Sequence, residues 1–231
     1  MNSYIRIPSD NAKIKNSTNK GFTMSAWFRT KGEPPYNTEV DTNRCEYFIF
    51  GRPGYHMGLS YTHGGFLKGV IWVRGIGNGE REAKVITFPV RSDEWHHTAL
   101  VVDDMKQEVI LYMDGEEVGR ESYDGELIPY HGKPFYIGVG DPNLSLWRNF
   151  YKGQIAEVGL WSNALNSAEL NQVFVKGIID SRGEYTTATL PVGVWDFKGG
   201  YDDNTFDVSG SGNHAKFYNV EFANKSLKTN T

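Results

Sequence analysis

Tryptophan and arginine occur close together at two places where both side chains could meet a ligand. Trp72 and Arg74 share the non-core face of a predicted strand, because side chains alternate between the two faces of a strand. Trp147 and Arg148 are adjacent in a predicted loop. An indole ring can stack on the C–H groups of a sugar, while a guanidinium can donate two parallel hydrogen bonds to hydroxyls or to a carboxylate. These pairs indicate a carbohydrate-binding surface.

The strand expected at Tyr55–Tyr61 adds two candidates, His56 and Tyr61. His56 falls on the face opposite Met57 in the period-two pattern, and Tyr61 ends the segment. We include both in the predicted ligand-binding set, together with Trp72, Arg74, Trp147 and Arg148. Trp27 also lies on a non-core face, but we expect loops to cover it.

Glycoside hydrolysis needs two carboxylates on one surface. The nearest approach to such a pair is the run that contains Glu39, Asp41 and Glu46. On a strand Glu39 and Asp41 would share a face, whereas Glu46 would point the other way. The run 33–44 is polar and contains proline, so we interpret it as a solvated loop and predict no catalytic residue there.

The adjacent His96 and His97 point to opposite faces of a strand and cannot share a metal ion. His97 is in phase with Ala99, so we expect it to be a core histidine whose polar atoms are satisfied. The glycine-rich segment 75–79 lies between predicted strands. A phosphate cradle would need a following helix, so this segment is interpreted as a hairpin tip.

Strands with period-two alternation, separated by Gly, Asn, Asp and Pro, are predicted along the whole chain. They are expected at Tyr4–Ile7, Phe22–Arg29, Tyr47–Phe50, Tyr55–Tyr61, Phe66–Arg74, Ala83–Pro89, His96–Val102, Glu108–Met113, Glu116–Tyr123, Phe135–Val139, Gly153–Trp161, Val192–Phe197 and His214–Val220. Only one helix is predicted. It follows a capping box at Asn166 and Glu169 and stops at Gly177.

The segment W-H-H-T-A-L-V-V-D-D at 95–104, followed by I-L-Y-M-D-G-E-E-V at 110–118, resembles the central hairpin of laminin-G-like, concanavalin A-like jelly-roll modules. The segments 150–161 and 164–170 resemble the closing part of that family. The resemblance implies an all-β, two-sheet antiparallel sandwich with one short helix. The family is mostly sugar-binding and adhesive, and it includes some glycan-cleaving enzymes, so the fold alone does not select an activity.

The family's parts occur here in rotated order. A W-x-F strand and a D-x-S-G-x-G-N turn usually come first in these modules, but here they come last, at Trp195–Phe197 and Asp207–Asn213. We expect residues 1–222 to form one domain, with 192–222 completing the sheet as permuted strands and 223–231 a disordered tail. A strand-swapped oligomer and an excised piece of a tandem array are the alternatives.

The resemblance also implies a structural Ca²⁺ site. Asp207, Asn213 and Glu157 match the positions that bind calcium in the resembling modules, and oxygen ligands beside a tight glycine turn suit that ion. The alternative is that Asp207 and Asn213 only form hydrogen-bonded turns.

Composition limits the partners. The net charge of −4 and the pI of 5.9 provide no basic field, so we expect neither nucleic acid nor an anionic membrane as a partner. The single cysteine, Cys45, excludes an intramolecular disulfide. No run of signal-peptide or membrane-spanning length is found, so no membrane insertion is expected. The resemblance nevertheless favours an extracellular, cell-surface or virion-exterior location.

We therefore expect a non-catalytic, lectin-like or adhesion module that binds a glycan or polysaccharide, with Ca²⁺ as its structural ion. Two alternatives stay open. One is a glycan hydrolase or lyase on the same fold, with His56, Tyr61 and Arg74 as candidate residues. The other is a structural fibre or capsid-surface subunit that forms a homo-oligomer through its terminal strands.

Overall fold

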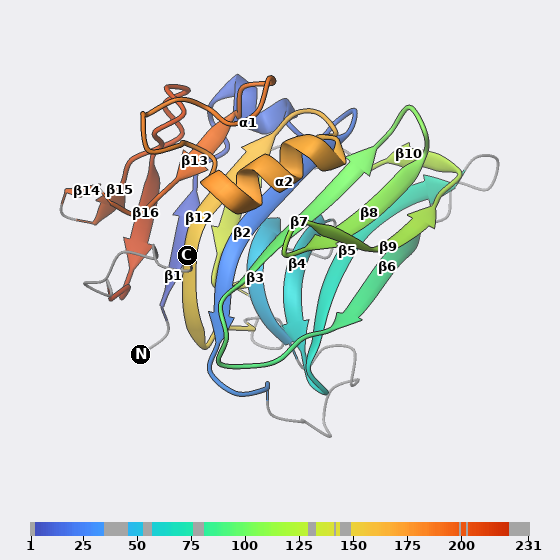
Figure 1. Cartoon of the computed structure of the whole chain (residues 1–231), viewed down its shortest axis with the longest axis horizontal. Helices are drawn as coiled ribbons and strands as arrows, with labels where there is room; N and C mark the ends of the chain where they lie inside the picture. Colours follow the sequence, from blue (N-terminus) through green and yellow to red (C-terminus); the bar gives the residue numbers. More distant parts are fainter. Residues whose placement is uncertain are drawn as a thin grey trace.

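The computed structural model describes residues 3–34, 46–52, 57–75, 81–128, 133–140, 142–143, 149–198, 200–201 and 203–221. Over these ranges the protein is a sandwich of two antiparallel β-sheets accompanied by two helices (Figure 1). The predicted all-β sandwich is confirmed. The prediction of a single helix is wrong, because a second short helix precedes the first long strand.

In the described chain the larger sheet has ten strands, and its order is β10-β5-β4-β3-β11-β1-β16-β15-β14, with β6 paired to β5. The bounds of its strands are β1 (Tyr4–Ile7), β3 (Glu46–Arg52), β4 (Met57–Thr62), β5 (Phe66–Gly75), β6 (Arg81–Pro89), β10 (Gly125–Leu127), β11 (Phe135–Ile137), β14 (Gly200–Tyr201), β15 (Asn204–Thr205) and β16 (Ala215–Tyr218).

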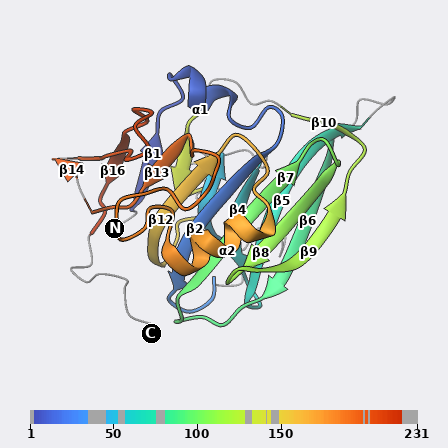
Figure 2. The same cartoon turned by 45° about the horizontal axis from the view of Figure 1, so that its top comes forward.

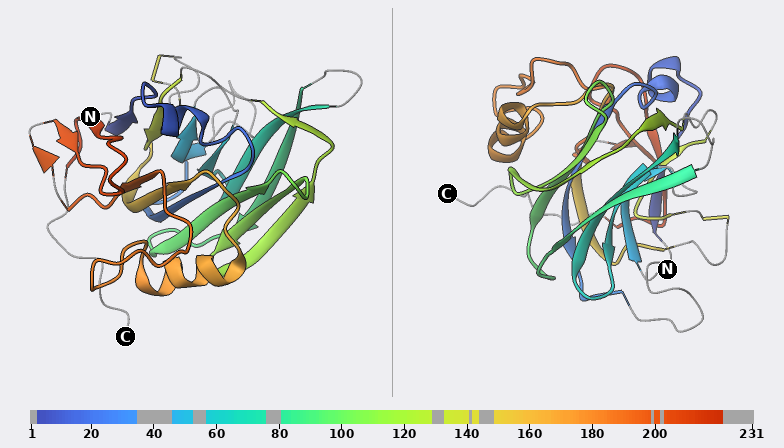
Figure 3. Two further views of the ribbon diagram at one scale, coloured as in Figure 1. Left: turned by 90° about the horizontal axis from the view of Figure 1, so that it is seen from above. Right: turned by 90° about the vertical axis from the view of Figure 1, so that its right-hand side faces the viewer.

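The smaller sheet has six strands among the described residues, in the order β13-β12-β2-β7-β8-β9. Their bounds are β2 (Phe22–Thr30), β7 (His96–Asp103), β8 (Glu108–Met113), β9 (Glu116–Ser122), β12 (Gly153–Trp161) and β13 (Gly193–Trp195). The end-on view shows the two sheets as curved layers, with helix α2 (Ser167–Lys176) outside the smaller one (Figure 3).

The main core lies between the sheets and follows from alternation along the strands. Ile5 and Ile7 of β1, Leu67 and Ile71 of β5, and Leu100 of β7 point inward and are buried. Gly69 leaves the space that Leu100 fills, since a Cβ there would lie 2.8 Å from the Leu100 Cδ1. A second buried cluster packs the outer face of the smaller sheet against α2. Only the outer face of the larger sheet is therefore left without a helical cover among the described residues.

The C-terminal strands enter both sheets of the same chain. β13 pairs with β12, and β16 pairs with β1, so the two ends of the described chain lie side by side (Figure 2). Trp195 of β13 is fully buried, and its Nε1 donates to the Asn213 carbonyl at 2.9 Å. Its ring packs edge-on against Phe50 at 6.2 Å.

The two helices differ in how clearly the sequence encodes them. α2 begins after the predicted capping box, in which Asn166 Oδ1 accepts from Glu169 N and Glu169 Oε2 accepts from Asn166 N. Helix α1 (Ala12–Asn16) has five residues, which is too short to establish a helical period. Tertiary contacts stabilise it, because buried Arg52 donates to the Ile14 and Lys15 carbonyls at its C-terminal end.

Candidate functional site

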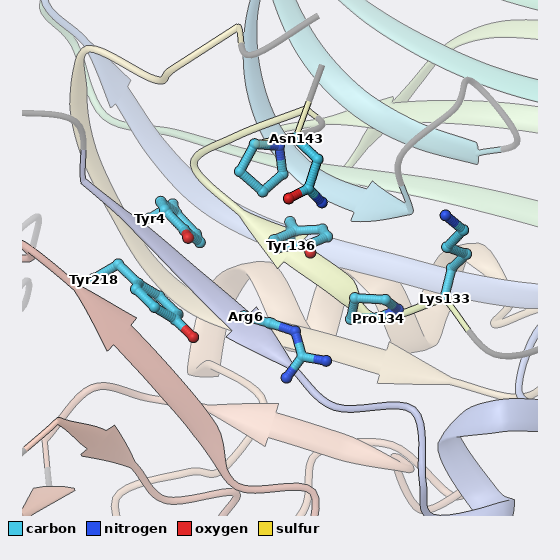
Figure 4. A pocket seen from close by; sticks show the side chains of 8 residues that line it. Tyr4, Arg6, Lys133, Pro134, Tyr136, Asn143 and Tyr218 are labelled. Atoms are coloured by element: carbon cyan, nitrogen blue, oxygen red, sulfur yellow. The ribbon is translucent and has the colours of Figure 1, made fainter. Parts of the chain in front are cut away.

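A pocket of about 360 Å³ lies on the outer face of the larger sheet, where β1, β11 and β16 run side by side. Tyr4, Arg6, Tyr136 and Tyr218 rise from these three strands into the same hollow (Figure 4). The other described residues that line it are Lys133, Pro134, Pro142 and Asn143.

Strand alternation places these side chains. Ile5 and Ile7 are buried in the core, so Tyr4 and Arg6 between and beside them must face outward. In β11 the buried Phe135 and Ile137 flank Tyr136 in the same way.

On β16, Ala215 is buried and Phe217 packs against the core, which leaves Lys216 and Tyr218 on the outer face. Every strand under the pocket is thus anchored by apolar side chains on its other face.

The strand register then brings the aromatic rings together. Tyr4 is directly opposite Tyr218 across the β1–β16 pair, and Arg6 is directly opposite Tyr136 across the β1–β11 pair. The Tyr4 and Tyr218 rings are stacked, with centroids 4.4 Å apart and planes 8° apart. Tyr136 lies 6.0 Å from Tyr4 in a tilted arrangement. Directly opposite pairs are the closest side-chain neighbours in an antiparallel sheet. The strand register therefore holds the tyrosine side chains beside one another before any ligand binds.

The pocket is cationic. Arg6 is half-buried, and its guanidinium makes no hydrogen bond or ion pair within the described part of the chain. Lys133 lines the opposite wall, and Lys216 is directly opposite Arg6 on β16. Burial raises the pKa of Tyr4, and Tyr218 acts in the same direction while Arg6 opposes it. Tyr4 is therefore a neutral phenol near pH 7 that can both donate and accept a hydrogen bond.

The described lining residues are aromatic, cationic, amide and proline side chains. Flat rings beside phenol, guanidinium, ammonium and amide donors can hold a molecule that has both C–H faces and oxygen atoms.

The predicted Trp72 and Arg74 do lie on the outer face of the larger sheet, but away from this pocket. They belong to β5, which is three strands from β11, or about 14 Å at the usual strand spacing. Arg74 is exposed, and Trp72 Nε1 is buried without a hydrogen-bond partner among the described residues.

Tyr61 does not lie on that outer surface. Its side chain is only 1% exposed and belongs to the main core, where its hydroxyl donates to the Val90 carbonyl at 3.4 Å. Burial raises the pKa of the Tyr61 phenol, and the charge of Glu33 adds to this. The other three predicted ligand-binding residues, His56, Trp147 and Arg148, lie outside the described residues.

The outer face also carries a buried ion pair, between β3 and β5. Lys68 Nζ lies 2.7 Å from Glu46 Oε2, and Ser60 Oγ donates to the same oxygen at 2.7 Å. Asn149 Nδ2 donates to Glu46 Oε1 at 3.2 Å. The Glu46 carboxylate is held by these donors among the described residues. Glu39 and Asp41 lie outside the described residues.

Of the three residues predicted to bind calcium, Asp207 and Asn213 contact each other, whereas Glu157 contacts Ile178. Asp207 and Asn213 are together, since Asp207 Oδ2 accepts from Asn213 N at 2.8 Å, while Asp207 Oδ1 accepts from Val194 N and Ser209 N. Glu157 Oε1 accepts from Ile178 N, just after α2. Asn213 Oδ1 is a buried oxygen without a hydrogen-bond partner in the described chain. Three or more His, Cys, Asp or Glu side chains do not cluster as a metal site within the described ranges.

The two central histidines behave differently. His96 Nδ1 lies 2.8 Å from Asp114 Oδ2, whereas both ring nitrogens of His97 are buried and lack a partner among the described residues. His97 is thus a core histidine, as predicted, but the expectation that it is satisfied is wrong. The physical reason is its surroundings, because the Trp27 and Phe174 rings lie on it and provide no acceptor.

Sequence reasoning missed the tyrosine pocket. The signal was Tyr4-Ile5-Arg6-Ile7, in which a tyrosine and an arginine share the face opposite two isoleucines. That pattern is the same as the one at Trp72 and Arg74, with a phenol in place of an indole. Its significance depends on Tyr136 and Tyr218, which only the sheet order brings beside it.

The sequence of residues 1–171 matches the family model of the Concanavalin A-like lectin/glucanases superfamily. No curated protein matches the chain. In the part of the chain that the structure describes, no helix is both long and apolar enough to cross a membrane.

Several solved structures share the fold. A "putative carbohydrate binding protein" from Bacteroides ovatus superposes with a TM-score of 0.63 at 19% identity, and the match covers 96% of this chain and 60% of that protein. This chain thus spans less than two thirds of that protein's length.

Two further structures with this fold were solved as complexes. The CBM40 of the Ruminococcus gnavus IT-sialidase, bound to α2,3 sialyllactose, has a TM-score of 0.55 at 13% identity, with coverage of 75% and 94%. The binding domain of botulinum neurotoxin DC, in complex with SialylT, has a TM-score of 0.52 at 12% identity, with coverage of 74% and 39%. At these identities the likeness establishes the fold.

Proposed function

Because the chain belongs to the Concanavalin A-like lectin/glucanases superfamily, we propose that it is a non-catalytic carbohydrate-binding module. The proposed site is the pocket of Tyr4, Arg6, Tyr136 and Tyr218, which we call the tyrosine pocket. The observation that carries this proposal is the convergence of three tyrosines, of which Tyr136 is buried, with a guanidinium that has no partner among the described residues.

The geometry supports sugar as the ligand class. A pyranose has apolar C–H faces and a rim of hydroxyls, so it needs flat apolar surfaces together with several hydrogen-bond donors. The tyrosine pocket offers both, since the partly exposed Tyr4 and Tyr218 rings provide the flat surface, and their phenols and the Arg6 guanidinium provide polar atoms. The rings are fixed by strand pairing, so little side-chain entropy is lost on binding.

The comparisons support the same class. A carbohydrate-binding role is given in the description of the Bacteroides ovatus protein, and the Ruminococcus gnavus module is described with a bound sialyllactose. A binding role rather than cleavage fits the tyrosine pocket, because its described lining residues provide no pair of carboxyl groups.

A glycan array with the wild-type protein and two variants tests this proposal. Tyr218→Ala removes one ring of the stacked pair, and Trp72→Ala is the matched control on the same sheet face, at the place first predicted from the sequence. We expect binding of at least one glycan by the wild type and by Trp72→Ala. Loss of a ring contact worth about 1 kcal/mol would weaken Tyr218→Ala about fivefold.

Two outcomes contradict the proposal. Absence of wild-type binding to all glycans would contradict the function, and loss of binding only in Trp72→Ala would contradict the site. Incubation of the protein with each bound polysaccharide, followed by a reducing-end assay, tests the alternative that the module cleaves glycans. Release of new reducing ends would establish an enzyme.

We also propose an extracellular, cell-surface or virion-exterior location, since glycoconjugates are displayed on such surfaces. A shallow site binds weakly, so several copies of the module would increase avidity, either in a longer protein or in a homo-oligomer. Calcium at the Asp207–Asn213 turn stays a proposal, supported by the partnerless Asn213 Oδ1, and its role would be to hold the C-terminal strands in place.

A further inference from the structure

Among the described residues, the charged side chains that line the tyrosine pocket are all positive. Arg6 and Lys133 line it, Lys216 stands directly opposite Arg6, and no described lining residue is acidic. The whole chain carries a net charge of −4, so this local excess of positive charge opposes the average of the molecule. A local field of this kind favours an anionic ligand.

Among the positive groups of the pocket, Arg6 gives the strongest indication of an anionic ligand. Its guanidinium is half-buried between tyrosines, yet it forms no hydrogen bond or ion pair in the described chain. The two buried cations of this sheet have partners within the chain: the Arg52 guanidinium donates to Thr18 Oγ1 and two carbonyls, although its Nε has no partner among the described residues, and Lys68 contacts Glu46. A partly desolvated guanidinium without a partner costs free energy, which an anion from outside the chain would recover.

The geometry of the guanidinium narrows the choice of anion. Arginine donates in a planar fork that matches the paired oxygens of a carboxylate or a sulfate ester. Tyr4 and Tyr136 on either side of Arg6 would at the same time contact the sugar ring that carries this group. Neutral sugars could use the rings, but they would leave Arg6 without its ionic partner.

We propose that the tyrosine pocket selects anionic sugars, with Arg6 as the specificity-determining residue. This rests on the proposed function, because it names the ligand class of the same site. The shared chemistry is a planar or tetrahedral oxyanion on a sugar, supplied either by a sugar acid or by a sugar sulfate.

Matched pairs of ligands test the proposal, since the two members of each pair differ in one kind of anionic group. The pairs are polygalacturonate and its methyl ester, 3′-sialyllactose and its methyl ester, and chondroitin sulfate and desulfated chondroitin. We expect the wild type to bind the member that carries the anionic group about tenfold or more tightly in at least one pair. The first two pairs report a carboxylate and the third reports a sulfate. Desulfated chondroitin keeps its uronic carboxylates and so isolates the sulfate.

Charge-matched variants separate the role of Arg6 from a general effect of net charge. Arg6→Gln should lower affinity for the ligand that carries the anionic group about 10- to 100-fold and leave affinity for the member of the pair that lacks it almost unchanged. Arg6→Lys should retain part of the preference. Arg74→Gln removes the same charge from the same sheet face, about four strands or 19 Å away, and should change little. Thermal melting of each variant checks that it folds.

Failure of this inference can be distinguished from failure of the proposed function. Equal binding to both members of every pair, with Tyr218→Ala still weakening it, overturns anion selection while the carbohydrate site stands. A preference that Arg74→Gln abolishes and Arg6→Gln leaves intact also overturns it. No binding to any of the six ligands, nor to the glycan array, overturns both.

Discussion

The pH dependence of the free energy of unfolding tests whether His97 is buried in its neutral form. Its ring lies 5.5 Å from Trp27 and 6.1 Å from Phe174, and both of its nitrogens lack a partner among the described residues. Burial lowers the pKa of His97 from 6.5 to about 4, although the charge of Asp114 acts to raise it. The folded protein therefore keeps His97 neutral at pH values where the unfolded chain protonates it.

The sign and size of the effect follow from this difference. Above about pH 7 neither state binds the proton, so the free energy of unfolding does not depend on His97. As the pH falls from about 6.5 to about 4 the unfolded state takes up a proton that the folded state does not. Each pH unit in that window costs about 1.36 kcal/mol, so the full loss is about 3.4 kcal/mol and the loss at pH 4.5 is about 2.5 kcal/mol.

Urea unfolding near pH 7.5 and near pH 4.5 measures this loss. The His97→Phe variant cannot protonate and offers a ring to Trp27 and Phe174, so its loss between the two pH values should be smaller by about 2.5 kcal/mol. His97→Leu serves as a second variant, because a phenyl ring is larger than an imidazole and can overpack the site.

The comparison uses the difference between two pH values within each variant, so a change in baseline stability does not affect it. Equal pH dependence in the wild type, His97→Phe and His97→Leu would refute the reasoning, since it would mean that His97 is protonated equally in the folded and unfolded states.

Three further predictions concern stability. Trp195→Ala should lower the free energy of unfolding by about 3–5 kcal/mol in urea titrations, because Trp195 is fully buried; a loss below about 1 kcal/mol would contradict its place in the core. Lys68→Met should cost about 3–5 kcal/mol by leaving the Glu46 carboxylate buried without its cation, and adding Glu46→Gln should recover part of that loss; a double variant no more stable than Lys68→Met would argue against a coupled pair. The calcium proposal predicts that EDTA lowers the thermal midpoint of the wild type and that added Ca²⁺ restores it, whereas Asn213→Ala should lose this response; a midpoint insensitive to EDTA would count against the ion.

Most strands could be predicted because each carries its own pattern. Tyr4–Ile7, Glu108–Met113 and Gly153–Trp161 were predicted with the bounds that the structure has. The strands that were missed, β10, β14 and β15, have two or three residues, so no alternation can be read from them. Their existence depends on pairing with neighbours, which is a tertiary effect.

The site was harder to predict than the fold. The search for an aromatic ring next to an arginine identified Trp72 and Arg74, which do lie on an outward face, but it passed over Tyr4 and Arg6. A single strand shows only which residues share a face. That β1 lies between β11 and β16 is fixed by the order of strands in the sheet, and period-two patterns contain no information on that order.

The prediction for Tyr61 failed for a different reason, because the sequence pattern already indicated that this residue is buried. It is in phase with the core residues Met57 and Leu59 of the same strand, and it is buried with them. Its inclusion in the predicted ligand-binding set followed its chemical type, although its face phase already placed it inside. Chemical type and face phase must therefore agree before a strand residue is assigned to a surface site.

A crystal structure of the protein with its best-binding oligosaccharide tests the central claim most directly. We predict that a sugar ring lies against Tyr4, Tyr136 and Tyr218, with an oxygen of the ligand within hydrogen-bonding distance of the Arg6 guanidinium. A sugar bound at Trp72 and Arg74, or on the smaller sheet, with the tyrosine pocket empty, would contradict the account.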